Sequence, residues 1–116
     1  MKVVHFEHDL FYSARLRQEL RLNLRQRGHT YLETQNFSEL DRELPNADVL
    51  LMNPLEFDSG VPKHYVTRFP SLRSALVVAD RKCLRVPETT IIFEYQEVRQ
   101  ILDFIYSGRP ERPKAG

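Results

Sequence analysis

The stretch that decides the fold is ADVLLM, Ala47 to Met52, followed directly by Asn53. Every residue from Val49 to Met52 is apolar, so a strand here would be buried on both faces. A strand of this kind is typical of the middle of a parallel sheet that is covered by helices on both sides. Asn53 then places one polar side chain at the carboxyl end of that strand.

Segments with strand and helix patterns alternate on either side of this stretch. Strands are predicted at residues 2–6, 29–35, 47–52, 74–79 and 89–95, and helices at residues 10–27, 39–44, 61–69 and 96–107. We expect Asp9 and Ser38 to cap the first two helices and Gly28 to end the first. The last helix has the clearest pattern, because its apolar residues recur at three- and four-residue intervals. The alternation predicts right-handed crossovers and a doubly wound sheet of five parallel strands.

Composition limits the classes of protein to consider. The chain has 116 residues, enough for one domain with a single core. Its mean hydropathy of -0.47 and the lack of a long apolar run argue against a membrane span, and its start does not resemble a secretion signal. We therefore expect a cytoplasmic protein. A single cysteine excludes an intrachain disulfide, and a net charge of +1 gives no general attraction to nucleic acid.

The order and spacing of the elements resemble the receiver domain of two-component response regulators. KVVHFEHD is similar to the first receiver strand with its acidic cluster, ADVLLMN to the third strand and SALVVA to the fourth. The resemblance implies a flavodoxin-like sheet with strand order 2-1-3-4-5. We expect one receiver-like domain at residues 1–107 and a disordered tail at 108–116. Residues 80–88 lack an apolar stripe, so the usual fourth helix is expected to be reduced or absent.

The resemblance also shows where the chain departs from a working receiver. Phosphoryl transfer there needs a carboxylate nucleophile, Mg²⁺ held by oxygen ligands, and a hydroxyl and a lysine on the phosphoryl oxygens. The acceptor position falls on Asn53, whose neutral amide cannot form an acyl phosphate. The lysine position falls on Phe93 or Glu94. The degenerate pocket implied by the resemblance consists of Glu7, His8, Asp9, Asn53 and Ala79, where Ala79 stands at the hydroxyl position.

These departures predict a pseudo-receiver that acts in signalling or regulation through self-association or a protein partner. We expect it to have no enzymatic activity and to need no metal or cofactor. Side chains outside the predicted core are candidates for the interaction surface. They are Tyr95, Phe104, Tyr106, Arg17 and Arg21.

Two other readings stay open at this point. The first is a flavodoxin-like domain, with or without enzymatic activity, that binds a small anion, a nucleotide or a metal at the edge formed by Glu7, His8, Asp9 and Asn53. The second is nucleic-acid binding through the arginine-rich first helix, although the lack of a recognisable helix-turn-helix in the sequence argues against it. Each arginine and each ring also has a simpler interpretation as ordinary surface or packing.

Overall fold

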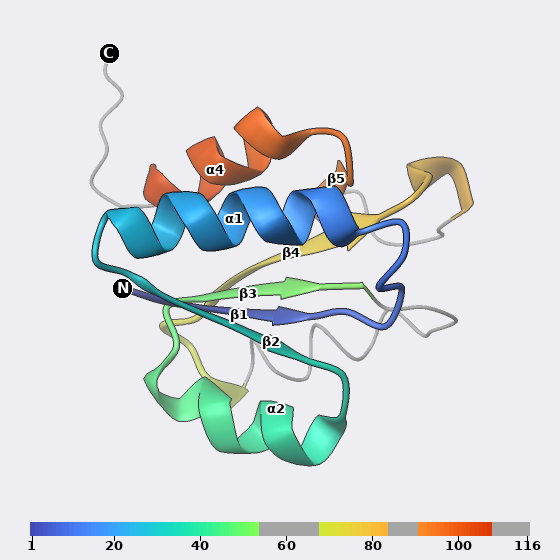
Figure 1. Cartoon of the computed structure of the whole chain (residues 1–116). Coiled ribbons are helices and arrows are strands. Elements are labelled where there is room, and N and C mark those ends of the chain that lie inside the picture. The colour runs from blue at the N-terminus through green and yellow to red at the C-terminus, as the bar shows by residue number, and fades with distance from the viewer. Residues whose placement is uncertain (54–67, 84–90, 108–116) are drawn as a thin grey trace.

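A computed structural model describes residues 1–53, 68–83 and 91–107 of the chain (Figure 1). In chain order the elements are β1 (Lys2–Phe6), α1 (Ala14–Gln26), β2 (Thr30–Thr34), α2 (Phe37–Glu43), a 3-10 turn (Leu44–Asn46), β3 (Val49–Met52), β4 (Arg73–Val78), a 3-10 turn (Arg81–Cys83), β5 (Ile92–Glu94) and α4 (Val98–Tyr106). All five predicted strands are present.

The strands form one parallel sheet in the order β2-β1-β3-β4-β5, the order of a flavodoxin-like fold. In the register of the sheet, Phe6 of β1 pairs with Met52 of β3. β3 is buried along its whole length, as the sequence ADVLLM predicts. The predicted fold class is therefore confirmed.

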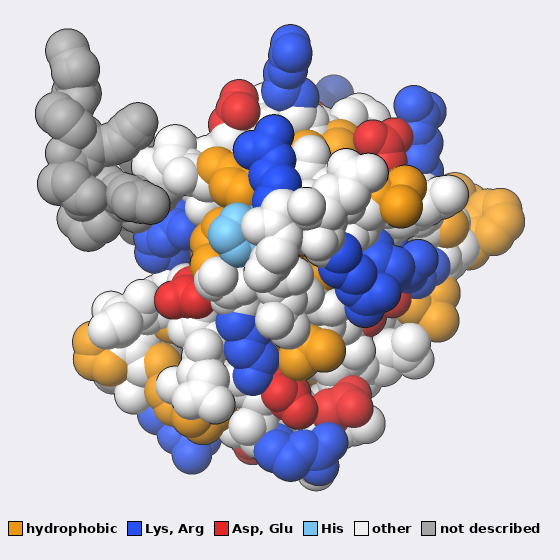
Figure 2. Space-filling model, turned by 60° about the vertical axis from the view of Figure 1, so that its left-hand side comes forward, with side chains coloured by type: hydrophobic (Ala, Val, Ile, Leu, Met, Phe, Trp, Pro, Cys, Tyr) orange, Lys and Arg blue, Asp and Glu red, His pale blue; other side chains and the backbone are white. Residues whose placement is uncertain are grey.

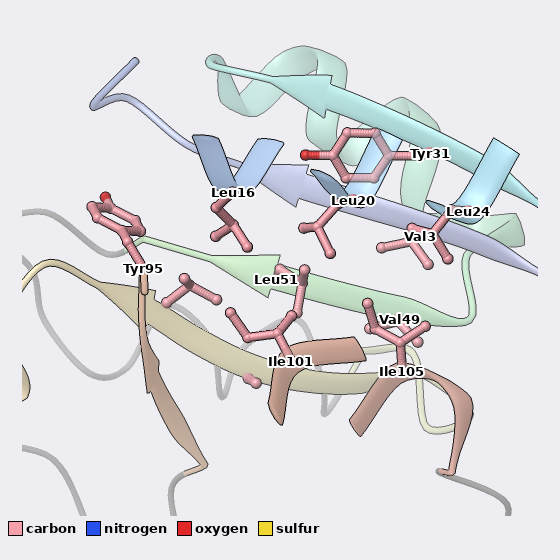
Figure 3. Packing of buried hydrophobic residues seen from close by; sticks show 12 residues of the cluster. Val3, Leu16, Leu20, Leu24, Tyr31, Val49, Leu51, Tyr95, Ile101 and Ile105 are labelled. Atoms are coloured by element: carbon pink, nitrogen blue, oxygen red, sulfur yellow. The ribbon is translucent and has the colours of Figure 1, made fainter. Parts of the chain in front are cut away.

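The two faces of the sheet bury alternate residues of each strand. Helices α1 and α4 lie side by side over one face, and α2 covers the other (Figure 1). On the first face, Leu16, Leu20 and Leu24 of α1 pack with Val3 of β1 and Leu51 of β3 (Figure 3). On the second face, the intervening residues of the strands pack against α2. This second cluster includes Val4, Phe6, Leu40, Leu50 and Met52.

The start of α1 corrects the sequence analysis. The helix begins at Ala14 with Ser13 as its N-cap residue, four residues later than expected. The carboxylate of Asp9 accepts a hydrogen bond from the backbone N–H of Tyr12 at 3.0 Å, so Asp9 stabilises the turn before the helix instead of the helix itself. The end of the helix is as expected, because Gly28 has a φ of 79°, a conformation that glycine adopts without strain.

The cap of α2 is also different from the prediction. Asn36, two residues before Ser38, is the N-cap residue, and its side-chain oxygen accepts a hydrogen bond from the backbone N–H of Glu39 at 2.7 Å. Either residue type can cap a helix, and the sequence did not distinguish between them.

Several expectations fall outside the described residues. They concern most of the helix at 61–69, the part of segment 80–88 beyond the 3-10 turn, and the tail at 108–116. Among the residues that are described, no helix has the length and apolar character to cross a membrane.

Candidate functional site

Three polar side chains meet where the strands end, on the face covered by α1 and α4. Glu7, Asn53 and Tyr95 directly follow β1, β3 and β5. Parallel pairing continues through their backbones, because the N–H of Asn53 donates to the carbonyl of Phe6 at 2.9 Å and that of Tyr95 donates to the carbonyl of Val78 at 3.0 Å. The sheet itself therefore fixes where these side chains begin.

The three side chains are joined to one another by hydrogen bonds. Nδ2 of Asn53 donates to Oε2 of Glu7 at 2.6 Å and lies 2.7 Å from the hydroxyl of Tyr95. That hydroxyl donates to the same Glu7 oxygen at 2.7 Å, and the backbone N–H of Asp9 adds a fourth contact at 3.0 Å. All three side chains are buried, with Glu7 only 1% exposed. We call this set the Glu7–Asn53–Tyr95 cluster.

A second pair of buried side chains extends the cluster along the same face. Nδ1 of His5 lies 2.8 Å from the hydroxyl of Tyr31, and Nε2 of His5 lies 3.3 Å from Oε1 of Glu7. The histidine is fully buried and the tyrosine nearly so. A continuous row of polar groups thus runs from β2 through β1 to the ends of β3 and β5.

The surroundings of Glu7 favour its charged form. Burial by itself would raise the pKa of its carboxyl, but the hydrogen bond and charge interaction with His5, together with the hydrogen bonds from Asn53 and Tyr95, outweigh burial and lower it. The pKa of Tyr95 is raised, first by burial and then by the neighbouring Glu7, and that of Tyr31 is raised mainly by burial. Both phenols therefore stay neutral and able to donate.

The structure brings some residues of the predicted degenerate pocket together and separates others from them. It brings Glu7 and Asn53 into direct contact, and it holds Asp9 next to them through its backbone. His8 turns away, because its ring packs edge to face on Phe6, a residue of the cluster beneath α2, at 4.7 Å between centroids. Ala79 is exposed just after β4 and lines a pocket between α1 and α4.

Tyr95 is the residue that sequence reasoning assigned to the wrong environment. It was a candidate for an exposed interaction surface, but it is 8% exposed and its hydroxyl points into the cluster. It lies one residue after Glu94, which the receiver resemblance places at or next to the lysine position. Its neutral phenol contacts the side chain of Asn53 directly.

The other four candidates for the interaction surface are engaged within the molecule. Arg17 and Arg21 of α1 bind opposite oxygens of Glu33 on β2, at 3.1 Å and 2.8 Å. Phe104 packs on Phe93 at 5.7 Å between ring centroids. The fourth candidate, Tyr106, donates its hydroxyl to Asn23 at 2.6 Å. These contacts explain why the side chains lie where they do without requiring a partner.

The most exposed apolar side chains of the described residues lie in the turn between β1 and α1. Phe11 is 80% exposed and Tyr12 is 68% exposed, and Leu10 beside them is 40% exposed. The two rings contact each other edge to face at 5.0 Å between centroids. We call Leu10, Phe11 and Tyr12 the aromatic turn. The sequence analysis placed Leu10 in a helix and therefore missed this surface.

The arginines do not form one continuous surface on the face shown in Figure 2, where acidic and apolar side chains lie among the Lys and Arg side chains. The described residues also contain no group of three or more His, Cys, Asp or Glu side chains arranged to hold a metal ion. The site is thus a buried, internally bonded cluster at the carboxyl edge of a flavodoxin-like sheet.

Comparisons of the chain with protein-family models, with curated proteins and with solved structures found no match. The resemblance to receivers therefore stays a prediction.

Proposed function

We propose that this chain is a pseudo-receiver, a signalling or regulatory module that acts through protein contacts and does not transfer phosphoryl groups. The observation that carries the proposal is the bonding of Asn53. At the position where a receiver needs a free carboxylate, the chain has a neutral amide whose nitrogen contacts both Glu7 and Tyr95.

The chemistry of Glu7 supports the same proposal. Its Oε2 atom accepts from Asn53, from Tyr95 and from the backbone of Asp9. A metal ion or a phosphoryl group that approached this oxygen would have to displace buried donors, and a buried donor without an acceptor is costly. The carboxylate therefore serves to hold three strand ends together.

The aromatic turn is the surface best suited to a partner among the described residues. Large rings exposed next to each other are common at the centres of protein interfaces and uncommon on isolated surfaces. We favour this surface over the one expected from the sequence, because Tyr95 is buried and the other rings and arginines of that set make contacts within the molecule. A second copy of the chain or another protein would fit this role.

The alternative of a ligand bound directly by Glu7, His8, Asp9 and Asn53 has less support. His8 lies against Phe6, and the polar atoms of Glu7 and Asn53 face each other. A ligand at this edge would have to contact side chains on both faces of the sheet, because His8 packs on Phe6 of the cluster beneath α2, whereas Glu7 and Asn53 lie on the face of α1 and α4.

The proposal is tested with the variant Phe11→Ser and the matched control Leu22→Ser. Leu22 is also exposed, at 56%, but lies on α1 away from the turn. Sedimentation velocity over a concentration series reports self-association, and affinity capture from the native cell, read by mass spectrometry, reports other partners.

We expect the wild-type chain and Leu22→Ser to associate, with themselves or with one shared partner, and Phe11→Ser to lose that association by about tenfold or more. An association that is equally strong in all three proteins would contradict the assignment of the surface. A wild-type chain that stays monomeric and captures no partner would contradict the proposed function itself.

A further inference from the structure

A pocket of about 620 Å³ lies between the first turns of α1 and α4, beyond the ends of β4 and β5. This volume suits a small organic molecule. Open α/β sheets place their ligands at the carboxyl ends of the strands, and this pocket has that location. It lies beside the Glu7–Asn53–Tyr95 cluster but does not include Glu7 or Asn53.

The lining of the pocket is apolar at its inner wall and charged at its mouth. Leu16 and Tyr95 are buried, and Val98 and Leu102 are half-buried, so the inner wall is apolar and partly aromatic. The small side chain of Ala79 adds to the space, because a larger residue there would project into it. The inner wall favours a ligand with an apolar body.

Among the described lining residues, the mouth of the pocket carries more positive than negative charge. Arg15 and Arg99 are exposed there, against one carboxylate in this part of the chain, that of Glu19. Nε of Arg15 lies 3.3 Å from Glu19, an exposed pair of little strength. Arg99 has no ion pair among the described residues. Guanidinium groups bind carboxylate, sulfonate and phosphate oxygens well, so the mouth favours an anionic group.

Aromatic side chains at two levels of the pocket narrow the class of ligand further. Tyr95 lies in the inner wall, and the ring of Tyr12 stands at the mouth with most of its surface exposed. Planar apolar bodies pack well on such rings.

We propose that the pocket between α1 and α4 binds a small aromatic anion, with its ring system against Leu16, Tyr95 and Leu102 and its anionic group on Arg15 and Arg99. This inference rests on the pocket and does not depend on the proposed function. A ligand bound there would provide a means of regulation that needs no phosphoryl group. Tyr95 would contact both the ligand and the buried cluster, and Tyr12 belongs to both the pocket and the aromatic turn.

Anilinonaphthalene sulfonate is a suitable probe, since its fluorescence rises in apolar sites, and N-phenylnaphthylamine is its neutral analogue without the sulfonate. The test variant is Arg15→Gln/Arg99→Gln. The matched control is Arg42→Gln/Arg68→Gln, which removes the same charge from exposed arginines that pair with α2 residues. Circular dichroism confirms the fold of each variant.

We expect one saturable sulfonate site per wild-type chain, with affinity about tenfold weaker in Arg15→Gln/Arg99→Gln and unchanged in the control. The neutral analogue should bind both double variants equally. Ala79→Leu, which narrows the pocket, should weaken the binding of both probes. Equal loss in the two double variants, full retention in Arg15→Gln/Arg99→Gln, or loss caused by Phe11→Ser alone would overturn the proposal.

Discussion

Nδ2 of Asn53 donates a hydrogen bond to Oε2 of Glu7 at 2.6 Å, although the two residues are 46 positions apart in the chain. This contact joins the ends of β1 and β3, which are neighbours in the sheet. It requires a donor at position 53. A carboxylate there, as in a working receiver, would face the carboxylate of Glu7 across the same short distance.

The first prediction concerns Asn53→Asp. Two buried carboxyls in contact cannot both ionise at low cost, so the pKa of one of them is raised. The folded variant then binds more protons than the unfolded chain, and the penalty is largest near neutral pH and shrinks as the pH falls toward about 4. We expect a loss of about 3 kcal/mol at pH 7, measured by urea unfolding.

The matched control for this prediction is Asn23→Asp. Its side-chain oxygen accepts from Tyr106, and an aspartate can do the same. The stability of the Asn23→Asp variant should differ from that of the wild type by less than about 0.5 kcal/mol. Equal stabilities of Asn53→Asp and the wild type at pH 7 would show that the amide is not needed as a donor.

The second prediction concerns Glu7→Gln. The pKa of Glu7 is lowered in the folded protein, so its charged form contributes stability above the ordinary pKa of 4.5, and this contribution is lost as the pH falls through the lower folded value. We expect the variant to be less stable by about 1–3 kcal/mol at pH 7. The difference should narrow below pH 4.5. A stability difference between Glu7→Gln and the wild type that is constant with pH would rule out the charged carboxylate as its source. The control for loss of charge is Glu19→Gln, at an exposed site.

The third prediction concerns the hydroxyl of Tyr95. Tyr95→Phe keeps the ring in the core but removes one of the donors to Glu7 and a neighbour of Asn53. We expect a loss of about 1–2 kcal/mol in thermal or urea unfolding. Tyr12→Phe, which changes an exposed hydroxyl, should leave the stability the same. If Tyr95→Phe is as stable as the wild type and Tyr12→Phe, the cluster does not hold the strand ends together.

The fourth prediction separates two arginines of α1 that look alike in the sequence. The side chain of Arg17 is 15% exposed and contacts Glu33, Ser13 and the carbonyl of Leu10, whereas that of Arg15 is 87% exposed. Arg17→Ala should cost about 1–2 kcal/mol and Arg15→Ala less than about 0.5 kcal/mol. The reverse order in urea unfolding would contradict the structural role given to Arg17.

The sheet was predictable because its signals are local. Val49 to Met52 are apolar at every position, and this alone indicates a central parallel strand. The approach of Glu7 to Asn53 was also predictable in outline, since both follow neighbouring strands. The network beyond them was not, because the partner of His5 is Tyr31, on a different strand, and no local pattern pairs them. A histidine inside the apolar run KVVHF was the available signal, since a buried ring nitrogen needs a partner.

The errors at the surface have a different cause. Leu10 was assigned to the first helix, but the turn that Asp9 stabilises delays the start of α1 to Ala14 and leaves the aromatic turn exposed. Tyr95 was judged to be exposed because it ends a strand. Whether a residue at a strand end points into the fold depends on the helices that follow, and short-range patterns do not contain that information.

The measurement that tests the central claim most directly is the intact mass of the folded protein after incubation with acetyl phosphate and Mg²⁺, with a working receiver as a positive control in the same buffer. We predict that the wild-type chain gains no phosphoryl group under conditions that modify the control. A phosphoryl adduct on the wild-type chain that disappears in Glu7→Gln/Asp9→Asn would contradict the account, because it would show a reactive carboxylate beside Asn53, where the account proposes that none is available.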